Sequence, residues 1–287
     1  MDGRRVVITG ATSGIGRATA LALGRLGANL LLVSRNRPRG TKLARRIAGS
    51  GVTAEFIEAD LSSQVQVRAA ANHIRERWSS IDVLINNAGG RFDKFGSTAE
   101  GYEQTFATNH LSHFLLTGML LDRLIAAPAA RIITVASSAA ASAQNDGRWQ
   151  FFAADYDRKQ AYAKSKLASL LFAFELARRL RDTPVNSLAL DPGEVLTRFA
   201  LNNGIFPWLK HVVYHGLKRQ LLLPSQAADA LMYFASIVAL PPISEGEFFR
   251  RRQSIRACPA ACDLASASSL WNLSAILTGL DPAPGPA

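Results

Sequence analysis

A tyrosine and a lysine four residues apart, in Tyr162-Ala-Lys-Ser-Lys166, are the side chains of this sequence best suited to proton chemistry. Their flanks predict a helix, on which residues four apart lie on the same face. A nearby ammonium favours the phenolate, so we expect Lys166 to lower the pKa of Tyr162 below its ordinary value of about 10. Such a phenol can exchange a proton with an alcohol or carbonyl oxygen. Taken alone, the pair is equally compatible with a surface helix that carries a packed tyrosine.

A glycine-rich turn lies between the first predicted strand, residues 5–9, and a predicted helix over 18–26. Strand, turn and helix start are the context that a dinucleotide site requires. Gly10 permits a tight turn, Gly14 lets a pyrophosphate approach the backbone, and Gly16 lets the helix pack closely on the strand. The helix N-terminus offers amides and a positive dipole end to phosphates. The sequence therefore favours a phosphate-binding turn over a purely structural one, formed by Gly10, Thr12, Ser13, Gly14, Ile15 and Gly16.

Basic residues follow the second predicted strand, residues 28–33. NAD-binding sites usually place an acid here to bind the adenosine ribose 2′-hydroxyl, but Asp2 is the only acidic residue before Glu55. A guanidinium can bind a 2′-phosphate in bidentate fashion. Arg35, with Arg37 close by, therefore predicts a preference for NADP(H) over NAD(H). We assign the later basic residues to a solvated helix face: Arg39, Lys42, Arg45 and Arg46.

Alternating strands and helices continue along the chain, with strands predicted over 53–59, 81–85, 131–136 and 185–190 and helices over 64–78, 102–124 and 162–181. This alternation predicts the α/β class, as a single-domain, Rossmann-like, doubly wound parallel sheet with helices on both faces. We expect one domain over 1–280 and a flexible tail over 281–287. Ligands bind at the carboxyl ends of such strands. The residues predicted there are Asp60, Leu61, Asn87, Ala88, Gly89, Ser137, Pro192 and Gly193, and Asn109 lies near the start of an apolar helix.

Together these residues resemble the short-chain dehydrogenase/reductase family over nearly the whole chain. The motifs are Thr9-Gly10-x3-Gly14-x-Gly16, Asn86-Asn87-Ala88-Gly89, Asn109, Ser137, Tyr162-x3-Lys166 and Pro192-Gly193. The retinol-dehydrogenase-like branch is similar in Asn109-His-Leu-Ser-His-Phe-Leu-Leu-Thr117, in the 25-residue interval from Ser137 to Tyr162, in Tyr-x-Lys-Ser-Lys-Leu-Ala168 and in Leu270-Trp271-Asn272. Two positions depart from the pattern: Ala136 replaces a common serine, and Asp191 replaces a histidine often found before Pro-Gly.

The resemblance implies an NADP(H)-dependent oxidoreductase that interconverts a small lipophilic alcohol and its aldehyde or ketone. It assigns proton transfer to Tyr162, orientation of the reacting oxygen to Ser137, and contact with the nicotinamide ribose to Lys166. It gives Asn109 the role of holding that lysine and a relay water. Val195 and Thr197 would join Pro192 and Gly193 at the cofactor, and residues 194–225 would form the variable substrate region. A non-catalytic NADP(H)-binding sensor or membrane-associated interaction protein on the same fold is the alternative.

The basic composition, with a net charge of +11, raises the question of an anionic partner. No nucleic-acid-binding motif accompanies the basic clusters, so we expect no nucleic-acid partner. Residues 205–223 carry apolar side chains at helical spacing, which suits either a lid over a lipophilic pocket or a helix lying on a membrane surface.

Location and assembly follow from weaker signals. No signal peptide is expected, because the first strand begins at about residue 5, and no uncharged run of ~18 residues is present. The default location is cytoplasmic, and a peripheral membrane contact stays open. No metal site is expected, because no set of carboxylates or cysteines accompanies His110 and His113. The family resemblance also leaves open a homodimer formed through the helices that carry Asn109 and Tyr162.

Overall fold

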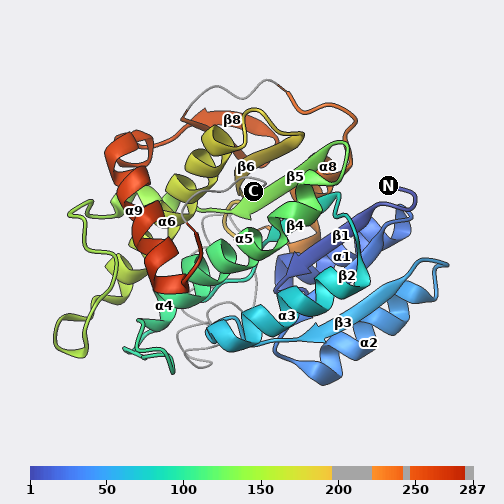
Figure 1. Ribbon diagram of the computed structural model, residues 1–287, viewed down its shortest axis with the longest axis horizontal. Helices are drawn as coiled ribbons and strands as arrows, with labels where there is room; N and C mark the ends of the chain where they lie inside the picture. The colour runs from blue at the N-terminus through green and yellow to red at the C-terminus, as the bar shows by residue number, and fades with distance from the viewer. Residues whose placement is uncertain (196–221, 242–245, 282–287) are drawn as a thin grey trace.

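The computed structural model describes residues 1–195, 222–241 and 246–281. Within these ranges the chain forms an eight-stranded sheet with the order β3-β2-β1-β4-β5-β6-β7-β8 (Figure 1). The strands are β1 (Arg5–Thr9), β2 (Asn29–Ser34), β3 (Ala54–Glu58), β4 (Val83–Asn86), β5 (Ala130–Val135), β6 (Val185–Asp191), β7 (Glu247–Arg250) and β8 (Gln253–Arg256). Neighbouring strands pair in parallel except β7 and β8, which pair antiparallel. The strand order reverses between β1 and β4, which makes their carboxyl ends the expected ligand site.

Helices cover both faces of the sheet, as the alternation of strands and helices predicts (Figure 1). In β1, Val6 and Ile8 pack into one apolar cluster and Val7 into another, because successive side chains point to opposite faces. The first cluster includes residues of α1 (Gly14–Arg25), α2 (Arg37–Ala48) and α8 (Pro224–Ser236). The second includes residues of α3 (Gln64–Arg77), α5 (Ser112–Ile125), α6 (Arg158–Arg179) and α9 (Leu264–Thr278). The predicted fold class is confirmed.

The six predicted strands are confirmed with shifts of one or two residues at their ends, whereas one predicted helix is interrupted. The helix expected over 102–124 consists of α4 (Gln104–Phe106), the π-helix η1 (Ala107–Leu111) and α5. The insertion after β5 contains two short 3-10 helices, η2 (Ser138–Ser142) and η3 (Ala153–Asp155), and a third, η5 (Pro259–Cys262), precedes α9. Thr197 and residues 205–221 of the proposed lid lie outside the described residues.

The C-terminal helix α9, which the sequence analysis does not predict, lies against α5 and α6. Trp271 packs edge-on to Phe114 at 4.8 Å between ring centroids and stacks on Phe172 at 6.0 Å. His110 Nε2 lies 2.7 Å from the hydroxyl of Ser274, and Thr278 O accepts a hydrogen bond from Arg68. These contacts pack α9 against α5 and α6 of the same chain. The homodimer stays a prediction.

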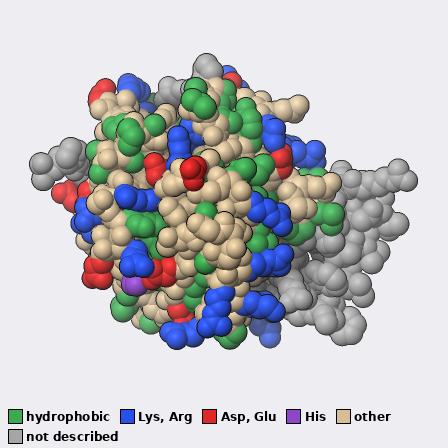
Figure 2. Space-filling view, turned by 90° about the vertical axis from the view of Figure 1, so that its right-hand side faces the viewer, with side chains coloured by type: hydrophobic (Ala, Val, Ile, Leu, Met, Phe, Trp, Pro, Cys, Tyr) green, Lys and Arg blue, Asp and Glu red, His purple; other side chains and the backbone are tan. Residues whose placement is uncertain are grey.

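Basic side chains lie at several places over the molecular surface. On the face in Figure 2, lysines and arginines are spread among acidic and uncharged side chains and do not form one continuous patch. None of the helices in the described ranges is long and apolar enough to span a bilayer.

Candidate active site

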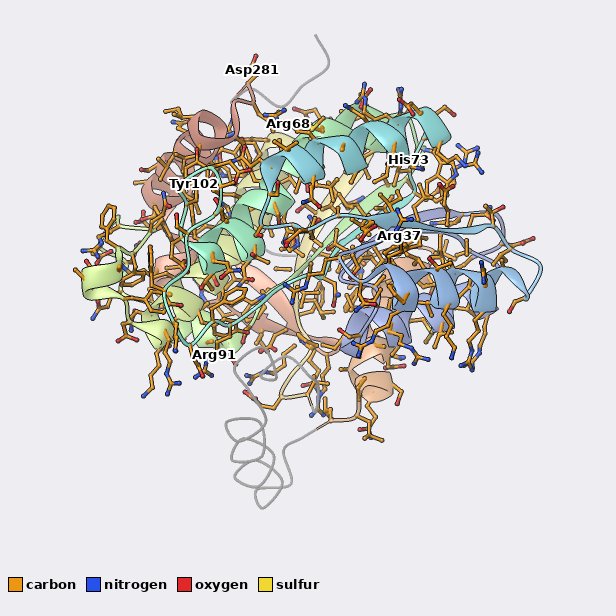
Figure 3. All side chains as sticks on the ribbon, turned by 90° about the horizontal axis from the view of Figure 1, so that it is seen from below. Arg37, Arg68, His73, Arg91, Tyr102 and Asp281 are labelled. Atoms are coloured by element: carbon orange, nitrogen blue, oxygen red, sulfur yellow. The ribbon has the colours of Figure 1, made fainter. Side chains whose placement is uncertain are left out.

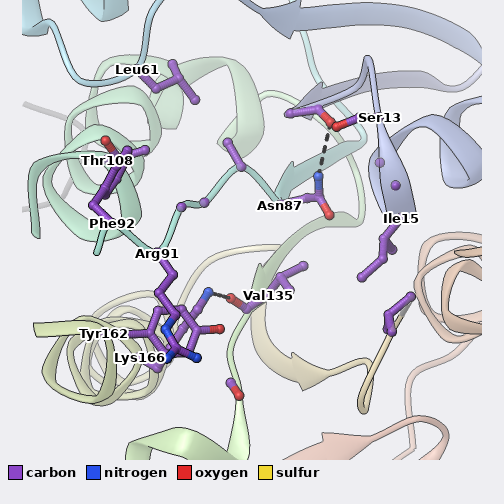
Figure 4. A pocket seen from close by; sticks show the side chains of 18 of the residues that line it. Ser13, Ile15, Leu61, Asn87, Arg91, Phe92, Thr108, Val135, Tyr162 and Lys166 are labelled. Carbon is purple, nitrogen blue, oxygen red and sulfur yellow. Dashed lines mark hydrogen bonds between the residues drawn. The ribbon is translucent and has the colours of Figure 1, made fainter. Parts of the chain in front are cut away.

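A cavity of about 1010 Å³ opens at the carboxyl ends of the central strands. The close-up in Figure 4 shows around it side chains from the turn after β1, from the loop after β4, from the end of β5 and from α6. Asn109 is not among its lining residues, and Thr197 lies outside the described part of the chain. The cavity brings together every other residue that the sequence assigns to the site: Gly10, Thr12, Ser13, Gly14, Ile15, Gly16, Arg35, Asp60, Leu61, Asn87, Ala88, Gly89, Ser137, Tyr162, Lys166, Pro192, Gly193 and Val195.

The glycine turn has the backbone geometry that a bound dinucleotide requires. Gly10 and Gly14 have φ values of 67° and 52°, a left-handed region that side chains disfavour. A Cβ on Gly16 would come within 2.5 Å of Gly10 O, and a Cβ on Gly10 within 2.9 Å of Ala88 Cα. The backbone therefore makes a tight turn that leads directly into α1, whose positive end favours phosphate. These residues fit the pyrophosphate of a dinucleotide cofactor.

The neighbouring turn after β4 is held to β1 by a small hydrogen-bond network. The Thr9 hydroxyl accepts from the backbone amides of Asn87 and Ala88, both at 3.0 Å. The Asn87 side chain donates to Thr9 O at 2.8 Å. Because these bonds join the two strands at which the sheet order reverses, they fix the floor of the cavity.

The end of the cavity beyond β2 is basic. Arg35 lines it, and Arg39 does too, although the sequence analysis assigned Arg39 to a solvated helix face. Asn36 caps α2 by accepting from the Arg39 amide at 3.0 Å, which fixes the position of that residue. Arg37 is not among the lining residues, and its Nε lies 2.6 Å from Glu58 Oε2 on the surface. Two guanidinium-bearing residues thus border the end of the cavity beyond β2.

Tyr162 and Lys166 lie on one face of α6, as their spacing predicts, and both line the cavity. The predicted lowering of the tyrosine pKa is wrong for this structure: burial raises the pKa of Tyr162 to about 12, and a hydrogen bond with Ser137 opposes the rise. Lys166 Nζ donates to Val135 O at 2.9 Å, the bond dashed in Figure 4, and lies 5.9 Å from the centroid of the Tyr162 ring. Burial also lowers the pKa of Lys166 to about 8.

Ser137 and Asn109 have different places in the site. Ser137 lines the cavity and hydrogen-bonds Tyr162, whereas Ser138 uses its amide to donate to Asp191 Oδ2 at 3.0 Å. Asn109, in the π-helix η1, accepts from Gly90 N at 2.7 Å and donates to Gly90 O at 2.9 Å. Its side chain also donates to Ser165 at 2.9 Å, which joins the loop after β4 to the helix that carries Tyr162.

Asp191 and Arg91 also line the cavity, although neither is among the residues that the sequence assigns to catalysis or to cofactor binding. Asp191 is buried, and its carboxylate accepts from the amides of Ser138 and Gly193 at 3.0 and 2.8 Å. It thereby holds the turns after β5 and β6, and its charge opposes the lowering of the Lys166 pKa. The sequence feature that could have pointed to Asp191 is its position directly before Pro192-Gly193, where a histidine is common.

Comparisons with known proteins agree with this geometry. The family model described as short chain dehydrogenase matches residues 4–204. Human retinol dehydrogenase 13 is 37% identical over 290 residues, which cover 98% of this chain and 86% of that protein. Retinol dehydrogenase 14 of the mouse is 34% identical over 293 residues, which cover 98% of this chain and 87% of that protein.

A solved structure agrees as well. The short-chain dehydrogenase from Sphingobium yanoikuyae, solved in complex with NADPH, is 27% identical with a TM-score of 0.64 over 80% of this chain and 84% of that one. The chain therefore belongs to the short-chain dehydrogenase family of oxidoreductases, in its retinol-dehydrogenase-like branch.

Proposed function

We propose that this protein is an NADP(H)-dependent oxidoreductase that interconverts a lipophilic alcohol and its aldehyde or ketone. The observation that carries the proposal is the meeting, in one cavity, of the glycine turn with Ser137, Tyr162 and Lys166. A protein that only binds the cofactor needs the turn but has no use for the Ser137–Tyr162 hydrogen bond. The names of the similar proteins, which include retinol dehydrogenases, support a lipophilic substrate.

The choice of NADP(H) rests on the charge beyond β2. Arg35 and Arg39 line that end of the cavity, and the residues that follow β2 include no acid to bind a free 2′-hydroxyl. A planar guanidinium binds a phosphate through two parallel hydrogen bonds. The NADPH complex of the related Sphingobium enzyme supports this choice.

The chain's own residues divide the proton chemistry among them. The chemistry that a bound nicotinamide supplies is hydride transfer to or from the reacting carbon. In the reduction direction, Tyr162 gives its phenolic proton to the oxygen as the carbonyl becomes an alcohol. Ser137 hydrogen-bonds the same oxygen and orients it. Because burial raises its pKa, Tyr162 is protonated at neutral pH and ready to act as the acid.

Lys166 and Asn109 support the reacting pair. The Lys166 ammonium is held by Val135 O beside the tyrosine ring, where it favours negative charge on the phenol oxygen. A Cβ on Gly89 would lie 3.3 Å from Asn109 Oδ1 and 3.8 Å from Lys166 Nζ. The side chains of Asn109 and Lys166 therefore both lie close to the backbone of Gly89. We assign to Asn109 the positioning of the Gly89-Gly90 turn against α6.

The test is NADPH-dependent reduction of a panel of aldehydes and ketones that includes retinal, followed by the loss of the reduced nicotinamide absorbance. Tyr162→Phe should lower turnover by at least about 100-fold, the low end of general acid–base contributions, and should leave NADPH binding intact. Tyr102→Phe is the matched control, because its hydroxyl donates to Leu277 O away from the cavity. Near-normal turnover by the Tyr162 variant would refute the assignment, and NADPH binding without turnover of any carbonyl by the wild type would favour the sensor.

A further inference from the structure

Arg91 is a cation in the reacting part of the cavity that the proposed reaction does not use. It follows the Gly89-Gly90 turn after β4 and lines the cavity together with Tyr162 and Lys166. Figure 4 shows its side chain extending towards these two residues. It lies away from the basic residues of α2, represented by Arg37 in Figure 3, so it does not belong to the adenosine end of the site.

The backbone around Arg91 is anchored on both sides. On one side, Asn109 binds both the amide and the carbonyl of Gly90, at 2.7 and 2.9 Å. On the other, the Tyr156 hydroxyl donates to Phe92 O at 2.8 Å, and Asp93 pairs with Arg158 at 2.9 Å. The guanidinium of Arg91 therefore extends from a fixed loop, which is the condition for orienting a ligand.

The charge of Arg91 acts on the phenol of Tyr162. It lowers the pKa of Tyr162, opposing the effects of burial and of the nearby carboxylates of Asp191 and Glu194. Asp191 is engaged by the amides of Ser138 and Gly193 and by Arg250 Nε at 3.4 Å. Arg91 and Tyr162 line the same cavity, so a carbonyl compound whose oxygen meets Tyr162 occupies a space that Arg91 also borders.

We infer that Arg91 determines substrate specificity by binding a carboxylate close to the reacting carbonyl of an otherwise apolar substrate. This inference rests on the proposed function and narrows its substrate class to apolar oxo acids and the matching hydroxy acids. A guanidinium fork matches the two oxygens of a carboxylate. Phe92, whose ring would come within 2.8 Å of a Cβ on Gly90, contributes an apolar surface to the cavity from the same loop.

The experiment compares long-chain oxo acids, in which the carboxylate stands at increasing distance from the carbonyl, with the methyl ester of each. Wild type, Arg91→Met, Arg91→Lys and Lys94→Met are assayed with NADPH. Lys94 is the matched control, because it is an exposed lysine of the same loop that does not line the cavity. Binding of NADPH by each variant reports that it folds.

The wild type should prefer one oxo acid to its ester. Arg91→Met should lower kcat/KM for that acid by about 10- to 100-fold, as expected when a hydrogen bond to a charged group is lost. The loss for the ester should be much smaller than that for the acid, because the ester loses only the effect of Arg91 on Tyr162. Arg91→Lys should be intermediate for the acid because a lysine keeps the charge without the fork.

Three results would overturn the inference: wild-type preference for esters or neutral aldehydes, an equal loss for acid and ester in Arg91→Met, or the same loss in Lys94→Met. If Arg91→Met does not fold, the wild-type preference and the Arg91→Lys result decide. A wild type that reduces no carbonyl compound at all would overturn the proposed function and this inference together.

Discussion

Removing the guanidinium of Arg35 should change cofactor preference. A hydrogen bond to a charged group contributes about 1.5–3 kcal/mol. Arg35 is exposed, so its contribution to binding lies at the low end, about 1.5 kcal/mol, which corresponds to about tenfold in affinity. Arg39 lines the same end of the cavity and retains part of the charge in the single variant. Arg35→Ala should thus weaken NADPH binding by about tenfold, and the Arg35→Ala/Arg39→Ala double variant by about 100-fold.

The assay is titration of each variant with NADPH and, separately, with NADH, because NADH lacks the 2′-phosphate and should bind the variants and the wild type alike. Arg37→Ala is the control, since that side chain pairs with Glu58 outside the cavity and should leave both affinities nearly unchanged. Equal weakening of NADPH and NADH by Arg35→Ala would refute the reasoning. So would an Arg37→Ala effect as large as that of Arg35→Ala.

Three further outcomes test the surroundings of the site. Because Lys166 has a pKa of about 8, the rate of carbonyl reduction should fall as the pH rises through about 8, and Lys166→Arg should move that fall to higher pH; a flat pH profile of kcat would contradict this. Trp271→Ala should lower the free energy of unfolding by about 3–5 kcal/mol in urea titrations, because it empties a buried aromatic contact; a loss below about 1 kcal/mol would contradict the packing of α9. Burial lowers the pKa of His110 from 6.5 to about 3. Below pH 6.5 the unfolded state therefore binds a proton at this histidine that the folded state does not bind. The free energy of unfolding should then fall by up to about 1.4 kcal/mol for each pH unit below 6.5. In urea titrations at several pH values, a His110→Phe/Ser274→Ala variant should show a smaller dependence of the free energy of unfolding on pH. An unchanged dependence would mean that other groups, and not His110, cause it.

The sheet could be predicted because each central strand is a short apolar run followed by polar residues or glycine. The strands at the edge could not. β7 pairs with β6 through Leu190 and Asp191, and the hairpin to β8 turns at Arg251, whose φ of 56° is unusual for a residue with a side chain. In the sequence this hairpin is a run of arginines, which favours an interpretation as a basic surface cluster. The π-helix at Asn109 could not be predicted either. A π-helix holds about one residue more per turn than an α-helix, and in a segment that is apolar throughout this change leaves no mark on the pattern of apolar residues.

The site residues could be predicted where the residue type itself has a specific chemical use. They could not be predicted where a residue's role depends on its place in the folded chain. The glycine turn and the Tyr162–Lys166 pair have spacings that the geometry of a turn and a helix explains. The pKa of Tyr162 was not predictable, because spacing shows the neighbouring cation but not the burial that outweighs it. The place of Arg39 was also out of reach, since only the fold shows which of many arginines line the cavity.

Carbonyl reduction by wild type and Tyr162→Phe, measured side by side with NADPH, tests the central claim most directly. The account predicts turnover by the wild type and a loss of at least about 100-fold in the variant, with NADPH affinity unchanged. Turnover by Tyr162→Phe within a few-fold of the wild type would contradict it, because the phenol would then not be the proton donor.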